Sequence, residues 1–261
     1  MKQCLIHVTL IILFSLTLLG QGLYWESTGH LSIMGNEREI SSKFYAMPKM
    51  FRSVDGEQHE AIIRLDKGII LNINHADSTY TEMTFEELDA MMKKGNAKMD
   101  ESMAELKDKM KDMPEDQRKM VEQMMGKNPA MGGSAEKYTS KNTGETEKIS
   151  GFNCTKYVVS QGDKEVLTVW ATKEVKGMEG LKKDMQAFRD RLASSMPKIG
   201  SAMAEGMKNV DGFPIRVESA NYKSTVTKVQ KQSTPASAFE APKSYKKVKL
   251  ESMDEKDEGK E

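Results

Sequence analysis

The run Ala61-Ile-Ile-Arg-Leu-Asp-Lys-Gly-Ile-Ile-Leu-Asn-Ile73 decides the fold class, because it has the pattern of two β-strands joined by a turn. Both apolar halves are short and rich in isoleucine, which is typical of strands, and Asp66-Lys67-Gly68 between them supplies turn residues. Asp55-Gly56 marks another tight turn just before this run. The sequence therefore predicts two consecutive β-hairpins in this region.

Strand patterns continue on both sides of these hairpins. The clearest is Phe213-Pro-Ile-Arg-Val-Glu218, in which every second residue is apolar and would lie on one face of a sheet. Short turns join antiparallel neighbours, so we expect one antiparallel sheet. The other expected strands cover residues 31–34, 40–47, 50–54, 147–149, 152–160, 165–171 and 222–231.

Two segments, 84–126 and 177–209, interrupt the strands with helical spacing and are rich in methionine. Thr84 followed by Glu87 has the spacing of a capping box at a helix start. Apolar residues then recur every three or four positions on one helical face until Pro114 breaks the pattern. That face would hold Leu88, Met92, Met99, Met103, Leu106, Met110 and Met113. The corresponding face of the later segment would hold Met178, Leu181, Met185, Phe188, Leu192 and Met196.

The two ends of the chain have compositions that differ from the middle. Residues 1–22 resemble a secretory signal peptide, with a lysine at position 2, an apolar run and small residues at the end. The apolar run is shorter than the ~20 residues that span a bilayer, so we expect no stable membrane span after cleavage. Residues 23–250 then form one domain, and the charged residues 251–261 form a disordered tail. This organisation predicts a periplasmic or secreted protein.

Charge and cysteine content exclude several classes of function. The chain has 39 basic and 39 acidic residues, which gives no electrostatic reason to bind nucleic acid. After signal cleavage Cys154 is the remaining cysteine, so no internal disulfide can form. It lies in a strand pattern, and we expect it to be buried as a small apolar residue.

Several blocks of sequence, taken in order, resemble one protein family. They are Tyr45-Ala-Met-Pro-Lys-Met-Phe-Arg52, Thr143-Gly-Glu145, Ile149-Ser-Gly-Phe-Asn-Cys-Thr-Lys-Tyr157, Val169-Trp-Ala-Thr-Lys173, Phe213-Pro-Ile215 and Phe239-Glu-Ala-Pro-Lys-Ser-Tyr245. The chain is similar here to the exported bacterial proteins of domain of unknown function 4412, a family similar in fold to the periplasmic outer-membrane lipoprotein carriers. The resemblance implies an α+β fold. A curved antiparallel half-barrel sheet would have its concave face covered by the two methionine-rich helical insertions.

Residues that could carry catalysis or bind metal are sparse. After cleavage the histidines are His30, His59 and His75, and none lies in a known zinc or hydrolase motif. Methionine thioethers can bind Cu(I), but these methionines follow the spacing of a helical core and have no histidine or cysteine among them. We therefore expect no enzyme activity, no cofactor and no metal.

These patterns leave three readings of the methionine-striped helices. The leading hypothesis is an exported, non-enzymatic binding protein for an apolar ligand, such as a lipid, an acyl chain or a lipidated protein. The alternative is a protein-interaction module of the cell envelope that uses the helices and has no small-molecule ligand. The methionines could also be ordinary core. The candidate apolar lining is Met92, Met99, Met103, Leu106, Met110, Met185, Phe188 and Leu192.

Overall fold

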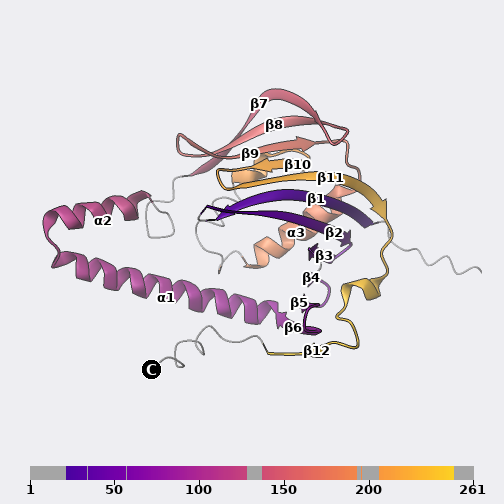
Figure 1. The fold of residues 1–261 in the computed structure, drawn as a ribbon, viewed down its shortest axis with the longest axis horizontal. Helices are drawn as coiled ribbons and strands as arrows, with labels where there is room; N and C mark the ends of the chain where they lie inside the picture. Colours follow the sequence, from indigo (N-terminus) through magenta and orange to yellow (C-terminus); the bar gives the residue numbers. More distant parts are fainter. Residues whose placement is uncertain are drawn as a thin grey trace, which may run out of the picture.

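The computed structural model describes residues 22–33, 35–56, 58–127, 137–192, 195 and 206–249. In these residues twelve strands form one open sheet, in the spatial order β12-β6-β5-β4-β3-β2-β1-β11-β10-β9-β8-β7 (Figure 1). Neighbouring strands are antiparallel, except for β12 and β6, which are parallel. The sheet is therefore mixed.

The strands and helices have the following bounds. The strands are β1 Gly22–Ile33, β2 Asn36–Met47, β3 Met50–Asp55, β4 His59–Arg64, β5 Ile69–Asn74, β6 Thr79–Thr84, β7 Tyr138–Ile149, β8 Phe152–Gln161, β9 Lys164–Thr172, β10 Phe213–Glu218, β11 Tyr222–Gln232 and β12 Lys246–Lys247. The helices are α1 Phe85–Lys111, α2 Glu115–Lys127 and α3 Met178–Leu192, with short 3-10 turns η2 Met207–Asn209 and η3 Ala236–Phe239.

The two predicted hairpins are confirmed. Gly56 joins β3 to β4 with a φ of 63°, and Gly68 joins β4 to β5 with a φ of 68°. Residues that have a side chain rarely adopt this left-handed backbone conformation, so such turns favour glycine. Register follows from the turns, and Ile63 lies opposite Ile70.

Helix α3 covers one face of the sheet, which we call the groove face. Trp25 of β1 and Phe213 of β10 belong to a cluster on this face, and Met178 and Leu181 pack against it. The far end of α3 reaches the beginning of α1, where the Phe188 and Phe85 rings lie 5.1 Å apart. Helix α3 thus lies across the groove face from the sheet centre towards β6 (Figure 1).

A C-terminal strap, residues 236–248, covers part of the opposite face. Phe239 is fully buried in a cluster with Ile62, Leu71 and Ile73 of β4 and β5. The strap then adds β12 to the edge of the sheet, where Lys246 pairs with Thr79.

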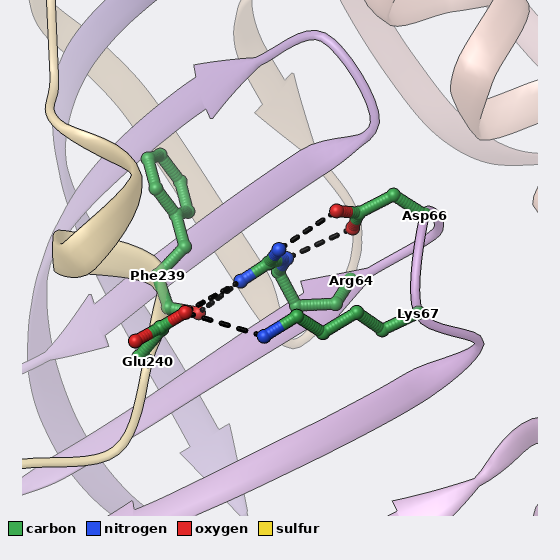
Figure 2. Close-up of polar contacts among 5 residues, drawn as sticks. All are labelled: Arg64, Asp66, Lys67, Phe239 and Glu240. Atoms are coloured by element: carbon green, nitrogen blue, oxygen red, sulfur yellow. Dashed lines mark hydrogen bonds and ion pairs between the residues drawn. The ribbon is translucent and has the colours of Figure 1, made fainter.

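A buried arginine fastens the strap (Figure 2). The Nε and Nη2 atoms of Arg64 donate to the two carboxylate oxygens of Asp66 at 2.8 and 2.7 Å, while Nη1 donates to the Phe239 carbonyl at 3.2 Å. Glu240 pairs with Arg64 at 3.5 Å and with Lys67 at 3.2 Å. The guanidinium holds the pKa of the Asp66 carboxyl below its usual range.

The predicted half-barrel with two helical insertions over its concave face is wrong. The sheet is mixed, has twelve strands and is not closed into a barrel. Helix α1 starts directly after β6 and runs away from the sheet, with α2 folding back at its far end (Figure 1). The reason is length: 27 residues of helix extend about 40 Å, and α1 begins where the edge strand ends.

The ends of the chain do not test the remaining predictions. Residues 1–21 of the expected signal peptide and the whole of the expected tail lie outside the described residues, and Gly22 is the first residue of β1. Among the helices that the structure describes, none has the length and apolar character needed to cross a membrane.

Candidate functional site

A groove of about 240 Å³ opens on the groove face, where β2, β1, β11 and β10 lie side by side. Strand alternation positions its walls, because every second residue of each strand projects from the same face. The lining residues are Trp25, Ser27, Gly29, Ile40, Ser42, Phe44, Phe213, Pro214, Ile215, Val217, Tyr222, Ser224 and Val226.

Aromatic rings close one end of the groove. Trp25 stacks on Phe44, its cross-strand neighbour, with ring centroids 5.0 Å apart. Phe213 meets the Trp25 ring edge-on at 5.6 Å, and Phe51 lies 5.9 Å from it. Such tilted and edge-on pairs stabilise each other beyond the area that they bury. With α3 packed against the same cluster, this end is covered.

The other end is open and has a shallow floor. Tyr222, at this end, is 38% exposed. Gly29 forms the floor, and a Cβ there would lie 2.5 Å from the Lys223 carbonyl oxygen on β11. Only a residue without a side chain lets the two strands pair this closely. The missing side chain of Gly29 therefore both allows β1 to pair with β11 and leaves the groove floor shallow.

Among the described residues, the lining carries no charged side chain. Its polar groups are hydroxyls, and that of Ser42 already donates to the Asp55 carboxylate at 2.6 Å. Ser27 is buried. Because an uncharged wall cannot compensate the desolvation of a charge, the groove is suited to apolar material.

The structure divides the predicted apolar lining between α1 and α3, and the groove wall contains none of it. On α1, Met99 is 49% exposed and Met110 is buried, whereas Met92, Met103 and Leu106 are half-buried. On α3, Leu192 is buried, and Met185 and Phe188 are half-buried. A ligand role for these residues stays a prediction.

Polar contacts join the two helices that carry these residues. The Ser195 hydroxyl donates to Asp89 of α1 at 2.5 Å, and the Asn96 amide of α1 donates to the Ser195 carbonyl at 2.9 Å. Arg191 pairs with Glu86 in the first turn of α1. The beginning of α1 is thereby tied to the end of α3, while the rest of α1 extends away from the sheet (Figure 1).

The sequence predicted the strand that carries the β2 residues of the groove, but the part of β1 that carries Trp25, Ser27 and Gly29 was missed. The first predicted strand began at Leu31, whereas β1 begins at Gly22. The available signal was the alternation of Leu23, Trp25 and Ser27 with Tyr24 and Glu26. Tyr24 is itself apolar in part and buried on the other face, which hides the period of two.

A series of hydrogen-bonded polar side chains lies on the strap side of the sheet. Glu60, which is buried, accepts from Arg52 at 2.8 Å and lies 3.2 Å from His75 Nε2. The other ring nitrogen of His75 lies 2.8 Å from the Tyr245 hydroxyl. Each of these polar groups has a hydrogen-bond or ion-pair partner, and together they connect β4 to the strap. Their role is to hold the strap, as Arg64 does.

Cys154 is buried, as predicted. Burial raises the pKa of its thiol, and the sulfur lies 3.5 Å from the Phe152 carbonyl oxygen. A protonated thiol in this setting is a packing residue and a poor nucleophile.

In comparisons with known proteins, the chain matches the model of one family. The model of a family described as Domain of unknown function (DUF4412) matches residues 72–245. No curated protein matches the chain. A solved structure titled "Structure of PNGF-II in C2 space group" is similar with a TM-score of 0.38 and 11% sequence identity. The similarity covers 91% of this chain and 32% of that one, so this chain spans about a third of its length.

Proposed function

This chain belongs to the DUF4412 family, as its sequence predicted, and we propose that it is an exported, non-enzymatic protein that binds an apolar ligand in the groove of the sheet. The observation that carries the proposal is an uncharged groove with aromatic rings at its covered end. The likeness in fold to the lipoprotein carriers is not confirmed, and the proposal does not depend on it.

The size of the groove narrows the ligand. Pockets for small molecules commonly hold roughly 300–1,000 Å³, and this one, at about 240 Å³, lies just below that range. A single acyl chain or a similarly narrow apolar molecule fits such a space better than a lipid with two chains. Each methylene that such a chain removes from water would contribute ~0.8 kcal/mol.

The rings that would meet the ligand are only partly buried in the unliganded protein. Trp25 and Phe44, which line the groove, both retain exposed area. Aromatic side chains bury large areas when they are covered, and they dominate the energetics of many interfaces. A ligand in the groove would cover this area without displacing α3.

A groove-filling substitution tests the proposal. Ser224 lies opposite Gly29 on the groove face, so Ser224→Trp should place an indole over the shallow floor. The matched control is Thr225→Trp, because the next residue on β11 projects from the opposite face. Binding is measured with Nile red, a neutral apolar dye, and folding is checked by circular dichroism.

The expected result is dye binding by the unmodified protein and by Thr225→Trp, and its loss in Ser224→Trp. Equal binding by the two folded variants would mean that the dye occupies another place. No binding by the unmodified protein would refute the proposed function. Export is tested separately by determining the N-terminal residue of the mature protein. Cleavage after Gly22 would make that residue Leu23.

A second candidate function, docking of a partner protein, is favoured by one observation. Exposed methionines lie on the two helices that leave the sheet: Met91 is 40%, Met99 49% and Met120 65% exposed. Methionine adapts to varied partner surfaces. Photo-crosslinking from positions 99 and 120 in intact cells should give one defined adduct if the helices dock a partner. The absence of a defined adduct would contradict docking.

A further inference from the structure

We propose that the occupant of the groove is a free single-chain carboxylic acid, with its tail at Trp25 and its carboxylate at Arg38. This inference rests on the proposed function and adds the chemical class of the ligand. Its basis is the position of one arginine relative to the open end of the groove.

Strand register places this arginine on the groove face. Ile40 and Ser42 of β2 line the groove, and Arg38 is the next residue in the same alternating series. Arg38 pairs with Leu31 of β1, and Leu31 pairs with Tyr222 of β11. The three residues therefore form one row across the sheet, immediately beyond the row of Ile40, Gly29 and Ser224 that ends the groove floor.

The row has the dimensions that a head group needs. Neighbouring strands lie about 4.8 Å apart, so the backbones of Arg38 and Tyr222 are roughly 10 Å apart, with Leu31 between them. Two long side chains can converge across that distance on one small group. Arginine presents a planar set of donors that matches a carboxylate, and a tyrosine hydroxyl can donate a further hydrogen bond.

The charge of Arg38 is not used elsewhere in the described part of the chain. It is exposed, and the described residues offer it no hydrogen bond or ion pair. Its neighbours Glu37 and Glu39 project from the opposite face by strand alternation. On the groove face, Asp55 lies level with Ser42, which holds it by a hydrogen bond, about 13 Å along the strand from Arg38.

Charge complementarity then orients the ligand. The wall from Trp25 to Gly29 is uncharged and suits a hydrocarbon tail, whereas the only cation in the row beyond it suits an anion. From Trp25 to Leu31 the strand advances about 20 Å, which is a length that a medium-chain or long-chain acid can span. One chain is favoured over two by the groove volume of about 240 Å³.

The test compares two ligands of equal chain length that differ at the head, decanoate and decanol. Each displaces Nile red from the full mature protein at neutral pH, and the dissociation constants are compared. The variant is Arg38→Gln, and the matched control is Lys43→Gln, which removes one positive charge from the same strand on the opposite face. Vesicles of phosphatidylglycerol represent the competing source of an anionic head with two chains.

We expect decanoate to bind about threefold to fivefold more tightly than decanol, since solvent screens an ion pair at an exposed arginine. Arg38→Gln should remove this preference and leave decanol binding unchanged, while Lys43→Gln should keep it. Equal binding of the two ligands by the unmodified protein would overturn the inference and leave the proposed function intact. Binding to vesicles without binding of decanoate would also overturn it, and binding of neither ligand would overturn both.

Discussion

Replacing Phe239 by alanine should detach the C-terminal strap without unfolding the whole sheet. The ring is fully buried and packs on Ile62, Leu71 and Ile73. It is the largest apolar side chain of η3, while Ala238 packs against the same cluster and Arg64 donates to the Phe239 carbonyl (Figure 2). The substitution would leave a cavity on the strap face, on the side of the sheet away from the groove.

The expected cost follows from that burial. Truncating a buried phenylalanine to alanine costs about 3–5 kcal/mol, the sum of lost transfer energy and the cavity left behind. The free energy of unfolding of an ordinary domain is about 5–15 kcal/mol, so the variant should still fold. Phe239→Leu keeps most of the volume and should cost less than half as much. Ser237→Ala, at an exposed position in the same turn, should change stability by less than about 0.5 kcal/mol.

Urea denaturation measures the cost, and limited proteolysis locates it. In Phe239→Ala, cleavage should appear first within residues 236–248, and Nile red binding at the groove should be retained. A loss of less than about 1 kcal/mol would refute the reasoning, because the ring would then not anchor the strap. Simultaneous loss of strap protection and dye binding would mean that the strap also supports the groove face.

Three further outcomes are expected. Arg64 lowers the pKa of Asp66, so the Asp66 carboxylate stabilises the fold at neutral pH. This stabilisation is lost as the pH falls below about 4. The difference in unfolding free energy between the wild type and Arg64→Gln, measured by urea titration, should therefore become smaller below that pH. Thr84→Ala removes the cap that donates to Glu87 and accepts from its backbone N–H, and should cost about 1 kcal/mol in the same assay, whereas Thr84→Ser should cost little. The buried thiol of Cys154 should react with a thiol reagent only after unfolding; rapid reaction of the native protein would contradict its burial.

Local features were predictable from the sequence because they depend on a few neighbouring residues. The turns at Gly56 and Gly68 follow from their left-handed backbone, and the capping box of α1 follows from Thr84 and Glu87. The burial of Cys154 follows from its place in an apolar strand pattern. Family membership was predictable as well, because it depends on the order of short blocks.

Features that depend on distant pairing were not predictable. The stripe from Met92 to Met110 defines one face of a helix, but its spacing cannot say whether that face meets a sheet. Strand β12 is the pair Lys246 and Lys247, whose charge argues against a strand, and its parallel pairing follows from Phe239 holding the strap beside β6. The groove combines β1 and β2 with β10 and β11, and no local pattern reports that combination.

The position of β1 has a consequence for the order of folding. It lies inside the sheet, paired with β2 on one side and with β11 on the other, where Leu23 faces Lys231. The β1–β6 part can form its own hairpins early, but the groove gains its second wall only when the chain has been made as far as β11. Pairing between such distant segments is slow, because the entropy cost of closing the loop comes before the contacts that stabilise it. The groove therefore lacks its β10–β11 wall, and β1 keeps an unpaired edge, until residues 222–232 have joined the sheet.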